Sequence, residues 1–331
     1  MNDFLKSKEF IDLIVASGSE DMDIAFAAQK KLALALQEPL RQGVLVGDVL
    51  SGVYEGNLLA PGATPKYTLD ILAPGEEGQY VAYTIPKSGR IPNKIIEGDY
   101  VLIPTYRIGN SIDWQLTMAR DARYDVVSRA MEVLYAGFIK KMNDDGFHTL
   151  LAAGVDRNVV VYDGDASAGQ FTKRLVELMR ITMIRNGGGN TGSIRRARLT
   201  DMFVSHECIS DIRNWGVDQV DDVTRREIFL NNNGVTNLFG VNLRPLDELG
   251  EDNEYQLYFT SQLAASMAAS DVEIVVGLDL STNDSFVMPI RENVSVFPDP
   301  TAHRNQMVSM YGWAELGFGV LDGRRVLIGS L

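Results

Sequence analysis

The sequence predicts an α+β protein, and three stretches of the chain carry this prediction. Residues 121–145 form one long amphipathic helical pattern without proline, residues 67–85 alternate as two strands, and residues 199–215 follow a strand-then-helix order. A long helix, a strand pair and a small mixed layer in one chain are typical of the α+β class.

Composition and charge exclude several function classes. The 331 residues are 45% hydrophobic and 23% charged, which is typical of a folded domain. The net charge of −13 disfavours a surface that binds nucleic-acid phosphates, because such a surface needs clustered Lys and Arg. Cys208 is the single cysteine, so an internal disulfide is excluded. No apolar run reaches the length of a membrane span, so we expect no membrane association.

The long helical pattern has one apolar side. Apolar side chains recur there at steps of three or four, and Asp121 and Gly146 are suited to cap its start and to close its end in the left-handed conformation. We expect the apolar side to pack on a core, with these residues at its centre: Val127, Met131, Leu134 and Phe138.

The N-terminal residues 1–43 carry two helical patterns separated by residues 17–19. Pro39 and Gly43 are expected to stop the second pattern. A segment of this length is too short for a core of its own, so it must pack on something else. We interpret it as an arm.

Six of the eleven prolines lie between residues 54 and 111, where they bound an alternating hairpin and a strand at 100–103. An isolated hairpin is marginally stable in water, so this one must lean on a neighbouring surface. Its candidate contact residues come from both strands and the connecting loop: Tyr67, Leu69, Ile71, Pro74, Tyr83 and Ile85.

The second half of the chain reads as shorter elements. Helices are expected at 170–185, 206–215 and 261–269, and strands at 199–204, 272–276, 286–290 and within 307–328. Residues 186–192 form a glycine-rich break, and residues 216–255 read as irregular. Within these parts, two basic and two acidic residues are candidates for charge pairing: Arg225, Arg226, Glu248 and Asp252.

No stretch predicts catalysis, a cofactor or a metal ion. The glycines at 187–192 resemble a phosphate loop, but Ser193 stands where the lysine belongs. Adjacent His206, Glu207 and Cys208 point in different directions on a helix, which is poor geometry for a metal site. We therefore expect a protein that is not an enzyme, with no catalytic, cofactor-binding or metal-binding residues.

Two segments resemble one known family. The segment EGDYVLIPTYRIGNSIDWQLTMARDARYDVVSRAMEVLYAGFIKKMNDDGF and the C-terminal YGWAELGFGVLDGRRVLI are similar to major capsid proteins of tailed bacteriophages, which have the Hong Kong 97-type fold. The order of parts agrees across most of the chain. The resemblance implies an N-terminal arm at 1–43, an E-loop with its flanking strands at 44–111, a P-domain at 112–186 with spine helix 121–145, an A-domain at 187–290, and a return to the P-domain at 291–331.

The same resemblance implies a function and partners. The chain is expected to assemble with itself, as hexamers and pentamers, into the icosahedral head of a tailed phage. That head would enclose double-stranded DNA without sequence-specific binding. Further expected partners are portal, scaffolding and decoration proteins, with no membrane. The expected location is the virion capsid, assembled in the host cytoplasm. The E-loop lysines at 66, 87 and 94 are crosslink candidates, but no motif identifies an Asn partner.

Two alternatives stay open at this point. An encapsulin-like nanocompartment would use the same fold to hold a cargo enzyme instead of a genome. A soluble α/β enzyme with an unrecognised site is the third hypothesis, and a compact monomer in solution would favour it.

Overall fold

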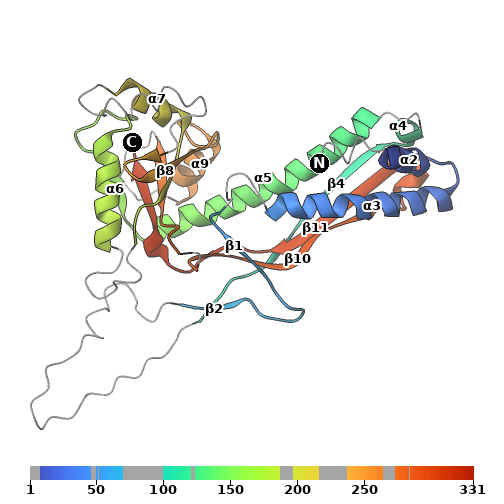
Figure 1. The fold of residues 1–331 in the computed structure, drawn as a ribbon, viewed down its shortest axis with the longest axis horizontal. Coiled ribbons are helices and arrows are strands. Elements are labelled where there is room, and N and C mark those ends of the chain that lie inside the picture. Colours follow the sequence, from blue (N-terminus) through green and yellow to red (C-terminus); the bar gives the residue numbers. More distant parts are fainter. Residues whose placement is uncertain are drawn as a thin grey trace, which may run out of the picture. The chain divides into compact units, whose positions relative to one another are not determined.

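The computed structural model describes residues 8–45, 50, 52–69, 100–120, 124–186, 197–215, 237–263, 273–282 and 284–331 (Figure 1). The chain divides into two compact units. The first takes Met1–Pro65, Leu102–Gly146 and Val287–Gly319, and the second takes Lys66–Val101, Phe147–Phe286 and Val320–Leu331. The α+β class predicted from the sequence is confirmed, since each unit combines helices with a sheet.

A sheet of long strands forms the frame of the first unit. Its order is β1 (Glu55–Leu58), β10 (Phe286–Pro298), β11 (Met307–Leu316) and β4 (Tyr106–Gln115), and β12 (Gly319–Val320) also pairs with β10. β1 is parallel to β10, and the other two pairings of this order are antiparallel. β11 and β4 stay in register over ten consecutive residue pairs, so this half of the sheet is regular.

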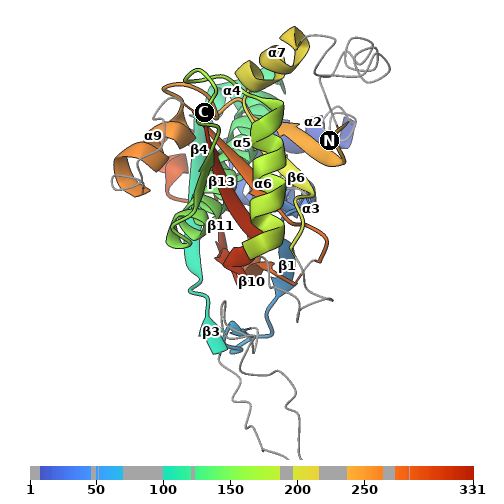
Figure 2. The same ribbon diagram turned by 90° about the vertical axis from the view of Figure 1, so that its left-hand side faces the viewer.

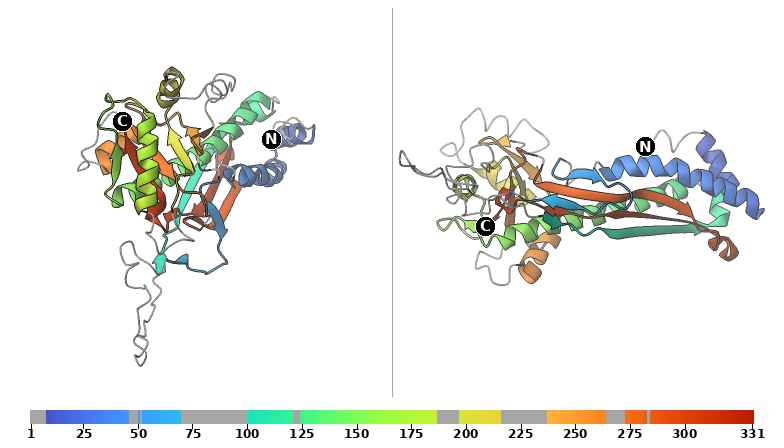
Figure 3. Two further views of the ribbon diagram at one scale, coloured as in Figure 1. Left: turned by 60° about the vertical axis from the view of Figure 1, so that its left-hand side comes forward. Right: turned by 90° about the horizontal axis from the view of Figure 1, so that it is seen from below.

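Helices cover one face of this sheet. They are α2 (Lys8–Ser17), α3 (Met22–Leu45), α4 (Leu116–Arg120) and α5 (Tyr124–Asp156). In the right-hand view of Figure 3, the ribbon of α5 passes behind the long strands. The shared core takes Ile14, Leu32, Leu134 and Phe138 from helices and alternate residues such as Val308, Met310 and Ala314 from β11. Alternation in a strand assigns successive side chains to opposite faces, so the other face of the sheet carries a different set.

The N-terminal helices pack within the chain itself. Ile14, Leu32 and Ala33 are buried in the core of the first unit. The expectation that Pro39 and Gly43 stop the second helix is wrong, because α3 continues to Leu45. A proline inside a helix removes one backbone hydrogen bond and clashes with the carbonyl four residues before it, which kinks a helix without always ending it.

The predicted end of the long helix is also wrong. α5 runs past Gly146 to Asp156, and Gly146 is not in the left-handed conformation. The left-handed residue after the helix is Asn158, with φ of 52°. Gly146 serves packing instead: a Cβ there would lie 2.2 Å from Leu50 Cδ1, and the Tyr54 hydroxyl donates to its carbonyl oxygen at 2.9 Å. The helix start expected at Asp121 lies outside the described residues.

The second unit is built on a mixed sheet of six strands. Their order is β5 (Val160–Tyr162), β13 (Val326–Ser330), β9 (Ile274–Leu278), β6 (Asp201–Val204), β8 (Val241–Pro245) and β7 (Asn237–Leu238). All residues of β6, β9 and β13 are buried, as expected for strands that are covered on both faces.

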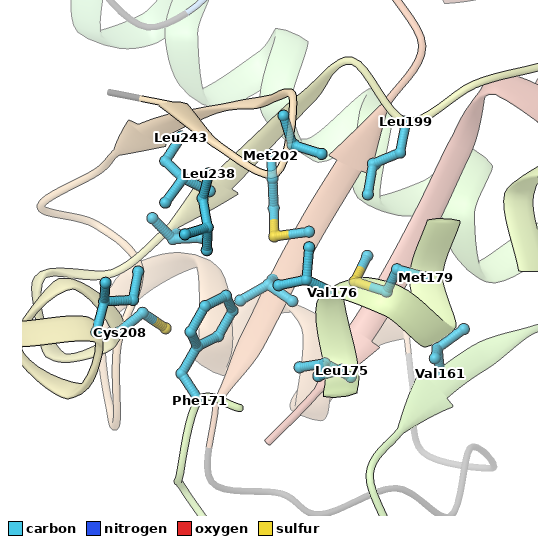
Figure 4. Packing of buried hydrophobic residues seen from close by; sticks show 14 of the residues in the cluster. Val161, Phe171, Leu175, Val176, Met179, Leu199, Met202, Cys208, Leu238 and Leu243 are labelled. Carbon is cyan, nitrogen blue, oxygen red and sulfur yellow. The ribbon is translucent and has the colours of Figure 1, made fainter. Parts of the chain in front are cut away.

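Helices α6 (Lys173–Asn186) and α7 (His206–Asn214) lie on one face of this sheet, and Figure 2 shows α6 against the strands around β13. Figure 4 shows the packing there, where Phe171, Met179 and Met202 meet among other apolar side chains. On the other face, Phe147 of α5 stacks on Tyr255 of α9 (Glu254–Tyr258), with ring centroids 4.3 Å apart. α5 thus supplies core residues to both units.

Several elements of the second half differ from the prediction. The segment read as irregular contains β7 and β8. β10 is a 13-residue strand where only residues 286–290 were predicted, because charged and polar residues after Ile290 hide its alternation. The glycine-rich break at 187–192 and residues 264–269 of the predicted helix lie outside the described residues.

Candidate interaction surfaces

The described part of the predicted hairpin is a short two-stranded sheet, formed by the residues on either side of 70–99, which lie outside the described residues. β2 (Lys66–Thr68) pairs there with β3 (Tyr100–Leu102), and the Ile103 N–H donates to the Pro65 carbonyl oxygen at 3.1 Å. Tyr100 and Leu102 are 67% and 57% exposed, which is high for large apolar side chains. Tyr67 and Leu69 are half-buried. The remaining candidate contact residues lie outside the described residues: Ile71, Pro74, Tyr83 and Ile85.

The face of the first sheet opposite the helices carries a row of aromatic rings. Phe297 of β10 lies opposite Tyr311 of β11, and their ring centroids are 5.9 Å apart. Phe297 also stacks on Trp313 at 4.6 Å, and the Trp313 indole donates to Glu292 Oε1 at 2.8 Å. Cross-strand aromatic pairs stabilise a sheet, and here they leave partly exposed apolar rings on it.

Beside this row, Glu315 of β11 is the centre of an ionic network. Its carboxylate accepts hydrogen bonds from Arg107 Nε at 3.1 Å, from the Thr105 hydroxyl at 3.1 Å and from Arg291 Nη1 at 3.0 Å. The hydrogen bond from Arg107, followed by those of its neighbours, holds the pKa of Glu315 below its usual value. The network ties β4, β10 and β11 together on this face.

Sequence reasoning did not identify this face as a surface. Tyr311 and Trp313 are two residues apart, which is the strand period, so their common face was readable from the sequence. Their partner Phe297 lies on another strand, and a cross-strand pairing cannot be read from local alternation.

Comparison with known protein families finds no matching family model, and comparison with curated proteins finds no match. Solved structures do match. A structure of Microbacterium phage Oxtober96 superposes with a TM-score of 0.55 at 10% identity, covering 84% of this chain and 88% of that one. The capsid of a native GTA particle superposes with a TM-score of 0.55 at 10% identity, covering 86% of this chain and 89% of that one. A structure of Mycobacterium phage Adephagia superposes with a TM-score of 0.54 at 12% identity, covering 86% of this chain and 89% of that one.

The chain has the Hong Kong 97-type capsid fold. The likeness covers most of this chain and of each of those chains, and it agrees with the fold expected from the sequence. The shared feature is the architecture, because identities of 10% to 12% leave few side chains in common.

Within the capsid fold, α5 holds the residues expected at the centre of the long-helix core. Leu134 and Phe138 are buried in the core of the first unit, 1% and 2% exposed. The side chains of Val127 and Met131 lie outside the described residues. Every described helix falls short of the length and apolarity that crossing a membrane requires.

For the charge pairing expected in the second unit, the structure describes the acidic residues and not the basic ones. Arg225 and Arg226 lie outside the described residues. Glu248 is half-buried and Asp252 is exposed, in the segment between β8 and α9. The pairing stays a prediction.

Among the described residues we looked at the side chains that most often act in catalysis or bind metals, which are those of His, Cys, Asp and Glu. His206 contacts Asp247 at 2.6 Å, but both side chains are exposed. No group of three or more His, Cys, Asp or Glu side chains is placed to hold a metal ion among the described residues. An open hollow of about 470 Å³ beside the start of α6 is lined by Asp163, Lys173 and Trp215 among others, with no His or Cys.

A buried carboxylic acid lies between α7 and the start of β9. Glu273 is 3% exposed, and its Oε1 accepts a hydrogen bond from the Cys208 thiol at 3.3 Å. Burial raises the pKa of Glu273, and the nearby carboxylates of Glu207 and Asp211 raise it further. Burial, together with Glu273, raises the pKa of the Cys208 thiol well above its usual range.

This cluster predicts a pH dependence of stability. Because the pKa of Glu273 is higher in the folded chain than in the unfolded chain, its stabilising effect is full below the ordinary Glu pKa and is lost as pH rises through the folded value. Between about pH 5 and pH 8 we expect the denaturant midpoint to fall more in the native protein than in Glu273→Gln. The fluorescence of Trp215 would measure the denaturant midpoint at each pH. The control is Glu251→Gln, because Glu251 is exposed. Equal slopes for the native protein and Glu273→Gln would contradict this prediction.

Proposed function

We propose that this chain is the major capsid protein of a tailed phage and assembles as hexamers and pentamers into an icosahedral head around double-stranded DNA. The observation that carries the proposal is the fold, which matches the capsid of a native GTA particle over 86% of this chain. The role is structural, and its location would be the virion, with assembly in the host cytoplasm.

The surfaces of the described residues support assembly. Two large apolar side chains of β3, Tyr100 and Leu102, are exposed in the single chain. Exposed apolar side chains that lie together mark contact surfaces of proteins. In the proposed shell the segment between β2 and β3 is the E-loop and lies across a neighbouring subunit. We also propose that the chain divides after residues 43, 111, 186 and 290 into the arm, the E-loop, the P-domain, the A-domain and the return to the P-domain.

The charge of the chain fits the proposed contents. A net charge of −13 gives the protein no general attraction for DNA phosphates. A container that binds its genome weakly and without sequence preference leaves the DNA free to enter and to leave. Portal, scaffolding and decoration proteins are further partners of the proposed head.

Electron microscopy of the expressed chain tests the proposal. We expect closed particles from the native sequence, and smaller soluble oligomers with few closed particles when residues 74–78 at the hairpin loop are deleted. The control replaces the same five residues by Gly and Ser, which keeps the number of residues between β2 and β3. A native chain that stays monomeric at concentrations at which capsid proteins assemble would refute the capsid function. Particles that copurify with a protein cargo and exclude DNA would identify a nanocompartment instead.

A further inference from the structure

The outer edge of β4 is open in the described structure. β4 is the last strand of its sheet and pairs on one side with β11 over ten residues without a bulge. Proteins usually protect edge strands with proline, lysine, a bulge or a short length. β4, with the sequence YRIGNSIDWQ, has none of these. Its edge therefore offers backbone N–H and C=O groups to another strand.

The exposed face of β4 carries one positive and one negative residue. Arg107 and Asp113 point to the same face, because they are six positions apart along a strand with a side-chain period of two. The Arg107 side chain is 73% exposed, and Asp113 is also exposed. Arg107 contacts Glu315 within the chain, whereas Asp113 has no ion pair among the described residues.

A second copy of β4 complements these charges in one register. In an antiparallel pair with a two-fold axis through Asn110, Arg107 of each copy lies opposite Asp113 of the other, so the ion pair forms twice. Moving the axis to Gly109 or Ser111 sets Arg107 opposite Ser111 or Gln115 and loses both pairs. An axis between two residues would turn the core faces of the two sheets to opposite sides. Charge and alternation thus select one register.

The helix beside Asn110 leaves room for this arrangement. The Asn110 amide donates to the Leu134 carbonyl oxygen at 3.4 Å, and a Cβ on Gly137 would lie 2.5 Å from the same amide nitrogen. Around this point, α5 exposes Val133, Ala136 and Gly137, which are small or apolar. The helices of two copies can therefore approach each other above the proposed axis, with apolar surface between them.

We propose that β4 of one copy pairs antiparallel with β4 of a second copy about Asn110, which joins the two sheets into one. The Ser111 N–H, now bonded to Asn110 Oδ1 at 2.9 Å, exchanges this local bond for one to the partner strand. The inference rests on the proposed function in one respect: an icosahedral shell contains two-fold axes, and a contact that lies on such an axis is self-complementary.

Disulfide trapping tests the register. The double variant Arg107→Cys/Asp113→Cys places two thiol pairs across the interface, and mild oxidation should give covalent dimers on a non-reducing gel. The single variants Arg107→Cys and Asp113→Cys are the controls, since neither brings two new thiols together in this register. Native Cys208 is buried and present in all three. No dimers from the double variant, or equal dimers from the single variants, would overturn the register.

Charge exchange tests the energetics with the protein otherwise intact. Asp113→Arg should weaken dimer formation in sedimentation velocity by about tenfold, because two attractions become two repulsions. Arg107→Asp/Asp113→Arg should restore it, while Arg291 keeps Glu315 paired within the chain. Unchanged association of Asp113→Arg would count against the interface.

The two proposals fail separately. Closed particles without the disulfide would leave the capsid function standing and remove the β4 interface. Covalent dimers from a chain that forms neither hexamers, pentamers nor closed particles would support the β4 interface and contradict the capsid function.

Discussion

Replacing Asp279 by alanine is expected to lower the free energy of unfolding by about 3–5 kcal/mol, because it removes the nearest counter-charge of the buried Arg325 guanidinium. The ion pair that remains, between Arg325 Nε and Asp322 Oδ2 at 3.6 Å, is longer. Asp279 is fully buried, and its Oδ2 accepts from Arg325 Nη1 at 3.0 Å while Arg325 is 2% exposed. The same carboxylate also accepts the backbone N–H of Arg198 at 3.0 Å and of Ser281 at 2.9 Å. One substitution thus removes the acceptor of three hydrogen bonds at the end of β9.

The measurement is chemical denaturation followed by Trp215, which belongs to the same unit, in a protein whose other two tryptophans are replaced by phenylalanine. Asp247→Ala is the matched control, because its pairing with His206 is exposed and surface pairs contribute little. The double variant Asp279→Leu/Arg325→Met should lie closer to the native protein than Asp279→Ala does. A single variant as stable as the Asp247→Ala control would show that the buried charge is compensated in another way.

Phe138→Ala is expected to lower the free energy of unfolding of the first unit by about 3–5 kcal/mol, which is typical of removing a buried aromatic side chain. Phe138 is 2% exposed and lies in the core that joins α5 to the sheet. A Cβ on Gly312 of β11 would lie 3.4 Å from its ring, so the ring is in close contact with the strand. The helix and the regular β4–β11 pair are rigid elements, so we expect them to fill the cavity only in part.

Trp114 is part of the same core and reports on this loss in denaturation experiments. Ile181→Ala on α6 is the control, since Ile181 is an exposed apolar side chain of the other unit. Phe138→Leu should lose less than Phe138→Ala, because it leaves a smaller cavity. A midpoint that moves equally for Phe138→Ala and Ile181→Ala would contradict the assignment of Phe138 to the core.

Local patterns predicted the elements whose apolar residues repeat regularly. The helical period of α5 was readable, and Leu134 and Phe138 are buried in the core of the first unit. The end of α5 was not, because Gly146 suggested a stop. Glycine costs a helix about 1 kcal/mol, and such a cost is easily exceeded by packing. The contacts of Gly146 with Leu50 and Phe318 come from distant parts of the chain, so no local signal reports them.

The candidate surfaces depended even more on distant pairings. β4 lies about 200 residues before β11, as the pairings of Tyr106 with Leu316 and of Gln115 with Met307 show. Alternation within each strand assigns side chains to two faces but does not say which strand lies beside it. The aromatic row and the open edge of β4 therefore emerge only when the sheet order is known.

By itself the sequence determined the α+β class, the acidic charge, the long helix and a resemblance to capsid proteins. These follow from composition and from periods of two and 3.6 residues, which act over a few neighbours. Only the tertiary structure decided which face of the first sheet is covered, which strand is left at its edge and which charges are buried. Those outcomes depend on contacts between residues far apart in the chain, where packing and hydrogen bonding outweigh local propensity.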